Sequence, residues 1–262
     1  MDAHGGRLAV EVLQRHGVDA MFTLSGGHLF VLYDGAVQAD LRLIDVRHEQ
    51  TATFAAEGWA KVTRRLGCAA ITAGPGVTNG VSAMTAAWMN GSPLVVLGGR
   101  APQRRWGAGS LQELDQPPIL APITKLAATV AEPTTAGAQV HAATRLACEP
   151  HRGPVFLDFP LDVFGPSAGD VPDGQGAAPD RSPDPDAVAS LAKLIARAER
   201  PAFLVGSDAY WDGAWCELEA AAELLGVPCY FNGLGRGLLP ADHPLAFLRT
   251  RGALKERADV VV

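Results

Sequence analysis

The sequence predicts an α/β protein: a doubly wound parallel sheet followed by a second, partial α/β unit. Short, nearly continuous apolar runs alternate with helix-like stretches along the whole chain, which is typical of parallel strands covered by helices on both faces. A stretch rich in Gly, Pro, Asp and Ala interrupts this rhythm, and such a composition buries little and favours an exposed linker. We therefore expect domains at 1–165 and 187–262, joined by a linker at 166–186.

The elements of the first domain follow from periodicity and from turn residues. Residues 7–16 place Leu8, Val12 and Leu13 on one helical stripe, and Gly17 is a typical helix stop. The stretch 48–65 is rich in alanine, which favours a long helix. The other expected elements are, in chain order, strand 19–24, helix 29–38, strand 41–45, strand 68–72, helix 77–89, strand 93–98, helix 138–148 and strand 154–159.

The second domain repeats the same alternation. The expected elements are helix 187–197, strand 201–206, helix 214–225 and strand 227–231. Residues 258–262 have the composition of a further buried strand, with no turn or helix after it. Because a half-built strand would expose unpaired backbone groups, we expect the chain to be part of a longer polypeptide.

Composition and charge argue against several classes of protein. The 262 residues carry a formal charge of -6, and arginines occur in pairs, not tracts, so we expect no nucleic-acid partner. No apolar run approaches the roughly 18 residues of a spanning helix, and the start lacks the layout of a secretory signal, so we expect a cytoplasmic protein without a membrane partner. The four cysteines form no CxxC pair, which argues against a zinc site or a disulfide framework, and Cys68 is expected in the core.

Three polar or glycine-rich segments each follow a predicted strand. They are Ser25-Gly26-Gly27-His28, Arg47-His48-Glu49-Gln50 and Ala73-Gly74-Pro75-Gly76-Val77-Thr78-Asn79. Ligands bind beyond the carboxyl ends of strands in open parallel sheets, so these segments are expected on one rim. Glycine lets the backbone turn with positive φ and approach a ligand closely. The alternative is that each glycine segment is only a tight strand-to-helix turn.

Glu49 is the strongest candidate for a chemical role. It lies at the start of a helix, where a carboxylate is electrostatically stabilised, so the alternative role is that of a helix-terminus acid. Its helix is largely apolar around Ala52 and Phe54, which predicts a partly buried side chain that can share a proton with a bound base. His28 and His48 are expected to be solvated or structural.

At these residues the sequence resembles the amino-terminal pyrimidine-binding domain of thiamine-diphosphate enzymes, within the acetolactate synthase large-subunit group. The resemblance covers essentially the whole chain, and residues from 187 onward look like the start of the family's central, Rossmann-like domain. The motifs that carry it are Arg47-His-Glu-Gln-Thr-Ala52, Thr72-Ala-Gly-Pro-Gly-Val-Thr-Asn79, Ser92-Pro-Leu-Val-Val96, Leu111-Gln-Glu113, Pro122-Ile-Thr-Lys125, Arg152-Gly-Pro-Val-Phe-Leu-Asp158, Gly206-Ser-Asp and Gly233-Leu-Gly-Arg-Gly237.

The resemblance also implies site residues and cofactors. Glu49 would hydrogen-bond N1′ of the cofactor's aminopyrimidine and promote the imino tautomer, which removes the proton from C2 of the thiazolium ring. Arg152 matches a position that contacts FAD in acetolactate synthases, and its alternative role is that of a surface arginine. The residues expected beside the pyrimidine are Thr72, Gly74, Pro75, Gly76 and Asn79, and those expected near the substrate are Gly26, Gly27 and Gln112.

Two departures from the acetolactate synthase pattern bear on the substrate. This chain has Leu24-Ser-Gly-Gly-His28 where the synthases usually have Tyr-Pro-Gly-Gly-Ala, and Leu161 replaces a common lysine. Both changes also resemble the 2-hydroxyacyl-CoA lyases. The expected function is carboligation or cleavage of 2-keto acids or 2-hydroxyacyl compounds, as in branched-chain amino acid biosynthesis.

The diphosphate site of the family has no counterpart in this sequence. In the family, thiamine diphosphate and Mg²⁺ are held by a Gly-Asp-Gly…Asn segment of a carboxyl-terminal domain, so we expect no metal ligand here and an inactive fragment. The resemblance implies a homodimer or homotetramer with active sites between subunits. Two alternatives stay open: one subunit of a split thiamine-diphosphate decarboxylase, and a non-catalytic nucleotide-binding module based on the glycines of 232–237.

Overall fold

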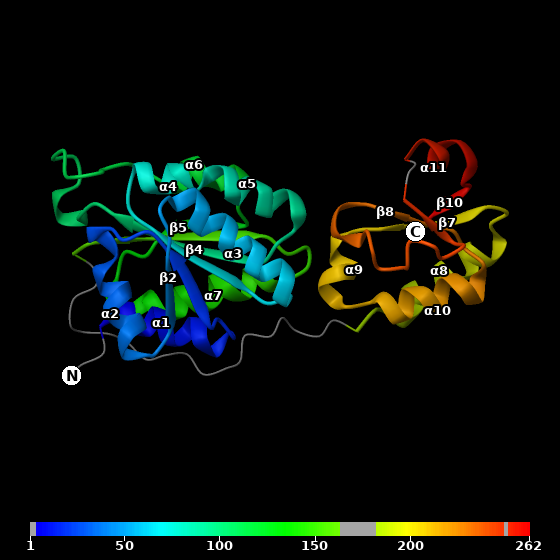
Figure 1. Cartoon of the computed structure of the whole chain (residues 1–262), viewed down its shortest axis with the longest axis horizontal. Coiled ribbons are helices and arrows are strands. Elements are labelled where there is room, and N and C mark those ends of the chain that lie inside the picture. Colours follow the sequence, from blue (N-terminus) through cyan, green and yellow to red (C-terminus); the bar gives the residue numbers. More distant parts are fainter. Residues whose placement is uncertain (1–3, 163–181, 249–250) are drawn as a thin grey trace. The chain divides into compact units, whose positions relative to one another are not determined.

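The computed structural model describes residues 4–162, 182–248 and 251–262. The chain divides into two compact units, 1–179 and 180–262 (Figure 1). Most of the segment expected as a linker, 166–186, lies outside the described residues, although its last two residues already belong to a helix that begins at Pro185.

The first unit is built on one sheet whose strands all run parallel. The strand order is β2-β1-β3-β4-β6-β5, and each neighbouring pair is parallel. The strands are β1 (Ala20–Thr23), β2 (Arg42–Asp45), β3 (Gly67–Ile71), β4 (Leu94–Arg100), β5 (Leu126–Thr129) and β6 (Pro154–Pro160). This confirms the predicted α/β class and the doubly wound parallel sheet.

Helices cover both faces of this sheet, as Figure 1 shows. Helices α1 (Gly5–Arg15), α2 (Phe30–Gln38) and α7 (Ala136–Cys148) pack together on one face. The other face carries α3 (Glu49–Thr63), α4 (Pro75–Asn79), α5 (Val81–Asn90) and α6 (Pro117–Leu120). Short 3₁₀ turns lie at Gly27–Leu29, Gln103–Arg105, Ala121–Ile123 and Pro133–Thr135. Each face encloses its own apolar cluster, one around Leu13 and Phe159, and the other around Ile71 and Phe156.

Two elements of this unit differ from the sequence prediction. Strand β5 was not predicted, because Leu126-Ala-Ala-Thr129 contains weak strand formers and is only half-buried at the sheet edge. The helix expected at 77–89 is two helices that meet at Gly80. A Cβ at Gly80 would lie 2.9 Å from Ile71 Cδ1, so this break packs closely against β3.

The chain reverses its direction of travel across the sheet between β1 and β3. From β1 the chain passes over one face to β2, whereas from β3 it passes over the other face to β4. The loops after β1 and β3 therefore diverge at the carboxyl ends of two neighbouring strands. Crevices of this kind are where open α/β sheets bind ligands.

The second unit contains another parallel sheet, in the order β10-β7-β8-β9. Its strands are β7 (Pro201–Val205), β8 (Cys229–Phe231), β9 (Ala246–Phe247) and β10 (Val260–Val261), and its helices are α8 (Pro185–Arg197), α9 (Ser207–Asp212), α10 (Trp215–Leu225) and α11 (Arg251–Arg257). The strand expected within 258–262 is β10, which pairs with β7. The glycines after β8 form a 3₁₀ turn at Gly233–Gly235.

Candidate active site

Glu49 is the first residue of α3, directly after the loop that leaves β2. His48 caps this helix, and its Nδ1 accepts a hydrogen bond from the Gln50 N–H at 3.1 Å. The Glu49 side chain is turned inward and only 7% exposed. Its Oε2 accepts a hydrogen bond of 3.0 Å from Asn79 Nδ2 at the end of α4. The carboxyl group is therefore both buried and oriented by an amide from the next strand-to-helix connection.

Thr72 brings the two glycine turns together. A Cβ at Gly26 would lie 2.4 Å from Thr72 Oγ1, and a Cβ at Gly76 would lie 2.6 Å from Thr72 Cγ2. The same Cβ at Gly76 would lie 3.1 Å from Glu49 Oε1. Both turns thus touch one buried threonine, and one of them also touches the carboxyl group. The three strand-end segments of the sequence analysis meet at a single rim of the sheet.

Gly74 needs a backbone conformation that other residues rarely adopt, with φ +56°. It packs against Gln112, since a Cβ at Gly74 would lie 2.9 Å from the Gln112 carbonyl oxygen. Gln112 also has a positive φ, of 58°, which is uncommon for a residue with a side chain. The loop after β4 therefore closes over the turn after β3 through two unusual backbone conformations.

A buried polar network that the sequence analysis did not single out supports this turn. The Gly74 N–H donates to Gln116 Oε1 at 2.7 Å, and Gln116 Nε2 donates to Asp158 Oδ2 at 2.8 Å. Arg100 Nη1 donates to the same Asp158 oxygen at 2.9 Å. Burial raises the pKa of Asp158 although the neighbouring hydrogen bonds and the Arg100 charge oppose this shift. Asp158 could have been found from the sequence, because it is a charged residue within the apolar run of β6. The sequence around Gln116 carries no comparable sign of its role.

A cavity of about 610 Å³ lies beside Thr72 at the same rim. His28 lines it and is 7% exposed, with Nδ1 3.4 Å from Thr72 Oγ1. Burial lowers the pKa of His28, and a hydrogen bond to the Leu111 backbone only partly opposes this shift, so near neutral pH the ring can both donate and accept hydrogen bonds. The lining residues are Ser25, Gly26, Gly27, His28, Thr72, Pro102, Arg105, Gly109, Ser110, Leu111, Gln112 and Leu161.

The structure does not bring every predicted residue to this rim. Pro75, the first residue of α4, does lie there, exposed between the buried Gly74 and Gly76. Arg152 precedes β6, so it lies at the amino ends of the parallel strands, on the edge opposite to Glu49. The candidate site therefore consists of the two glycine turns, Glu49 and the loop after β4, without Arg152.

Two sequence models of one family match this chain. The thiamine pyrophosphate enzyme, N-terminal TPP binding domain matches residues 3–119, and the central domain of the same enzymes matches residues 188–262. The chain belongs to the thiamine pyrophosphate enzyme family. Thiamine pyrophosphate is the same compound as thiamine diphosphate. Among the residues that the structure describes, no helix has both the length and the apolar character needed to cross a membrane.

Relatives with assigned names are similar to almost the whole chain. The probable acetolactate synthase of Mycobacterium bovis and the acetolactate synthase large subunit IlvG of Mycobacterium tuberculosis are each 48% identical over 262 residues, which is 99% of this chain and 48% of each relative. The human 2-hydroxyacyl-CoA lyase 2 is 35% identical over 296 residues, covering 99% of this chain and 47% of the lyase. The chain thus spans about half the length of the relatives it matches.

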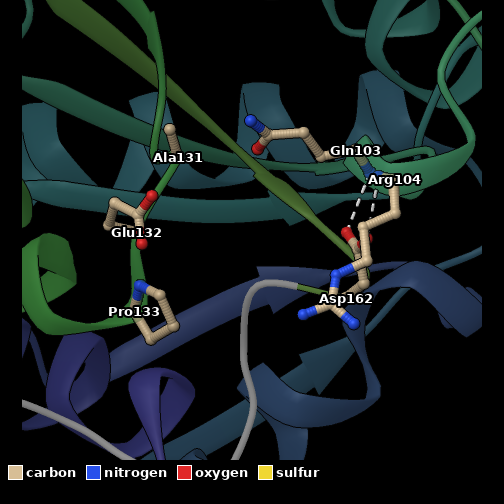
Figure 2. Close-up of a pocket in the computed structure, with 6 residues that line it drawn as sticks. All are labelled: Gln103, Arg104, Ala131, Glu132, Pro133 and Asp162. Atoms are coloured by element: carbon tan, nitrogen blue, oxygen red, sulfur yellow. Dashed lines mark hydrogen bonds between the residues drawn. The ribbon is translucent and has the colours of Figure 1, made fainter.

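A second hollow at the sheet's carboxyl edge contains none of the predicted site residues of this thiamine pyrophosphate enzyme chain. It has a volume of about 370 Å³ and lies between the loops after β4, β5 and β6. Figure 2 shows the Asp162 carboxylate accepting hydrogen bonds from the N–H groups of Gln103 and Arg104, at 2.8 and 3.0 Å. Burial alone would raise the pKa of Asp162, but these two bonds, one to its own backbone N–H and the Arg104 charge together lower it. Asp162 therefore anchors the loop after β4.

The second unit of this family member contains one set of side chains with metal-ligand spacing among the residues described. Atoms of Glu219, Glu223 and His243 all lie within 4.8 Å of one another. His243 Nδ1 accepts a hydrogen bond from the Leu245 N–H at 3.2 Å, so the neutral ring carries its hydrogen on Nε2, which faces Glu223 Oε1 at 3.4 Å. A metal-binding histidine normally donates from its other nitrogen, and this geometry instead favours a hydrogen-bonded pair.

Proposed function

We propose that the chain provides the pyrimidine-binding part of a thiamine-diphosphate-dependent carboligase or lyase acting on 2-keto acids, in the manner of the acetolactate synthases. The observation that carries this proposal is the buried Glu49 carboxyl, held by Asn79 and set against Gly76 at the point where the strand order reverses. A solvated acid at a helix start would have neither the burial nor the partner. The similarity of this chain to the two mycobacterial acetolactate synthases supports the same conclusion.

The residues present fit an aminopyrimidine ring. A ring nitrogen needs a carboxyl group in a dry setting, and Glu49 supplies one. Gly76 keeps the approach to Glu49 Oε1 open, because a Cβ there would crowd that oxygen at 3.1 Å. Pro75 at the start of α4 and the buried backbone of Gly74 complete a turn without bulky side chains. When bound, thiamine diphosphate supplies a nucleophilic carbon and an electron sink for the attacked carbonyl compound.

Each residue of the site then has a limited task. Glu49 holds and exchanges a proton with the pyrimidine ring, and Asn79 keeps the carboxyl group in one orientation. Thr72 fixes the spacing of the two glycine turns. Gly26, Gly27 and Gln112 border the cavity in which the 2-keto acid would lie. The neutral His28 ring presents a hydrogen-bonding group to that cavity.

Cleavage of 2-hydroxyacyl compounds is the second candidate function. His28 and Leu161, the two departures from the acetolactate synthase pattern, both line the cavity, and the human relative at 35% identity is named a 2-hydroxyacyl-CoA lyase. A split thiamine-diphosphate decarboxylase remains a further alternative.

The rest of the enzyme belongs to the same proposal. We expect Mg²⁺ to bind with the diphosphate outside this chain, and the chain by itself to be inactive. We also expect a cytoplasmic homodimer or homotetramer with the site between subunits. FAD at Arg152 is proposed for the synthase function only, so a flavin absorbance band in the purified enzyme would favour the synthase over the lyase.

Replacing Glu49 by Gln tests the proposal in the complete enzyme, with the diphosphate site present. Glu49→Gln keeps the size of the side chain and an acceptor for Asn79 but cannot exchange a proton, so turnover of pyruvate or of a 2-hydroxyacyl substrate should fall by about 10²- to 10⁴-fold. Glu11→Gln, on the far face in α1, is the matched control. Circular dichroism checks that both variants fold. Wild-type turnover in folded Glu49→Gln would refute the role of Glu49.

A further inference from the structure

We propose that Gln116 is a positioning residue that holds the Gly74 turn in the geometry required by the pyrimidine side of the site. The inference rests on the proposed function, because the turn matters to catalysis only if the pyrimidine ring lies against it. Gln116 is fully buried, with 0% exposure. It touches the turn and not the cavity, so its influence passes through the backbone of Gly74.

The hydrogen bonds of Gln116 fix its orientation. Its Nε2 donates to the Gly99 carbonyl oxygen at 2.9 Å and to Asp158 Oδ2 at 2.8 Å. Both of these atoms are acceptors, so the amide nitrogen must face them and Oε1 must face the Gly74 N–H. Both amide hydrogens and the amide oxygen are engaged. A buried amide satisfied in this way has one favourable arrangement and resists rotation.

Gly74 depends on this acceptor. It precedes α4 with φ +56° and ψ −114°, outside the helical range, and its N–H donates to the Gln116 side chain at 2.7 Å. A buried N–H without an acceptor is costly. Gln116 provides one from 42 positions along the chain. The side chain thereby selects a backbone conformation that the turn would not be expected to keep unaided.

The Gly74 turn contacts two parts of the candidate site, the Glu49 carboxyl and the edge of the cavity. Gly74 packs on the Gln112 backbone, and Gly76, two residues later, packs on the Glu49 carboxyl. A shift of the turn would therefore change the setting of Glu49 and the edge of the cavity together.

The other end of the network is anchored firmly. Arg100 binds Asp158 at 2.9 Å and Asp115 at 3.1 Å, and its guanidinium lies 4.0 Å from the ring centre of Trp106. These contacts join the end of β4, the end of β6 and the loop that carries Gln116. The turn after β3 is thus fastened to a part of the sheet that does not itself bind the pyrimidine ring.

Hydrogen exchange in the full chain without cofactor separates positioning from general stabilisation. In Gln116→Met, which keeps the length but removes the hydrogen bonds, the Gly74 amide should exchange at least about 10-fold faster, while amides of β3 and β4 keep their wild-type rates. Gln38→Met on the exposed side of α2 is the control and should leave Gly74 unchanged. An unchanged Gly74 rate, or a uniform rise across the unit, would overturn the proposal.

A second variant covers the case in which Gln116→Met does not fold. Gln116→Glu keeps an oxygen for the Gly74 N–H but loses the paired amide donors and places a carboxyl group beside Asp158. Exchange at Gly74 should lie between the wild-type and Gln116→Met rates, or above wild type if only Gln116→Glu can be measured. A wild-type rate in Gln116→Glu would contradict the proposal.

The complete enzyme provides the functional readout. For the Gln116 variants, the thiamine diphosphate concentration that gives half-maximal activity should rise at least about 10-fold, with a smaller change in the KM for the carbonyl substrate. An unchanged cofactor requirement would mean that the turn geometry does not govern the site. If Glu49→Gln keeps its turnover while Gly74 still loses protection in Gln116→Met, the proposed function fails but the link between Gln116 and the turn stands.

Discussion

Gly76 and Gly26 both pack on Thr72, but we expect the Thr72→Ala substitution to relieve the clash of an added Cβ at Gly76 and not at Gly26. A double-mutant cycle for each glycine measures this difference. A Cβ at Gly76 would lie 2.6 Å from Thr72 Cγ2 but 3.4 Å from Thr72 Cβ. A Cβ at Gly26 would lie 2.4 Å from Thr72 Oγ1 and 2.5 Å from Thr72 Cβ. Thr72→Ala removes Cγ2 and Oγ1 and keeps Cβ, so it relieves the first clash and leaves the second.

The distances set the expected magnitudes. Overpacking a rigid, buried neighbour costs about 1–3 kcal/mol, and replacing glycine by alanine within a helix returns about 0.5–1 kcal/mol. Gly76→Ala should therefore destabilise the first unit by about 1–2 kcal/mol in the wild type. With Thr72→Ala it should be nearly neutral, because the helix gain then offsets the remaining contact of the new Cβ with Glu49 Oε1 at 3.1 Å. The coupling free energy should be about 1–2 kcal/mol for Gly76 with Thr72, and below about 0.5 kcal/mol for Gly26 with Thr72.

Urea unfolding of the full chain provides the assay, with the tryptophans of α3 and α5 reporting on the first unit. The three single and two double variants are compared with wild type at one pH with a common slope. Equal coupling for the two glycines, or coupling near zero for Gly76, would show that Thr72 does not set the spacing of the two turns.

Two further predictions follow from groups whose pKa is shifted by burial. Burial raises the pKa of Asp158 above the ordinary value of an aspartate, so the folded state favours its neutral form. The stability gained from this is complete at acid pH and is lost as the pH rises through the folded-state pKa. The advantage of wild type over Asp158→Asn in urea midpoints should therefore shrink from pH 4 to 8, and an advantage that grows would contradict this. Burial raises the pKa of the Cys68 thiol to about 12. A thiol reagent should therefore modify the exposed Cys216 first and Cys68 only on unfolding. Labelling is followed by peptide mass, and early labelling of Cys68 would contradict its burial.

Local patterns were sufficient to predict most of the fold. Apolar runs of strand length separated by amphipathic stretches identified five of the six strands of the first sheet within a few residues. Strand β5 was missed because its alanines indicate a strand weakly, and it is held at the edge mainly by pairing with β6. The α4–α5 break was missed because it depends on close packing of Gly80 against β3, which the helical pattern of 77–89 does not reveal.

The residues of the candidate site that follow strand ends could be predicted from the sequence. The hydrogen bonds that orient them come from residues far away in the chain and could not. The position of Glu49 after a strand and the apolar surroundings in its helix predicted a partly buried carboxyl. Its orientation depends on Asn79, 30 positions along the chain. Gln116 bonds to Gly74, 42 positions before it, and to Asp158, 42 positions after it. No local pattern in a single sequence marks such pairs.

The reversal of strand order between β1 and β3 has a consequence for how this protein can change. The opening there results from two chain segments leaving in opposite directions, and the close packing of Gly26 and Gly76 on Thr72 sets its inner edge. His28 and Leu161 lie in loops that line this opening, so under the proposed function their substitution would alter which carbonyl compound is accepted without changing the sheet. On that proposal, specificity can change through replacements in the loops at the strand ends, without changes to the strands themselves.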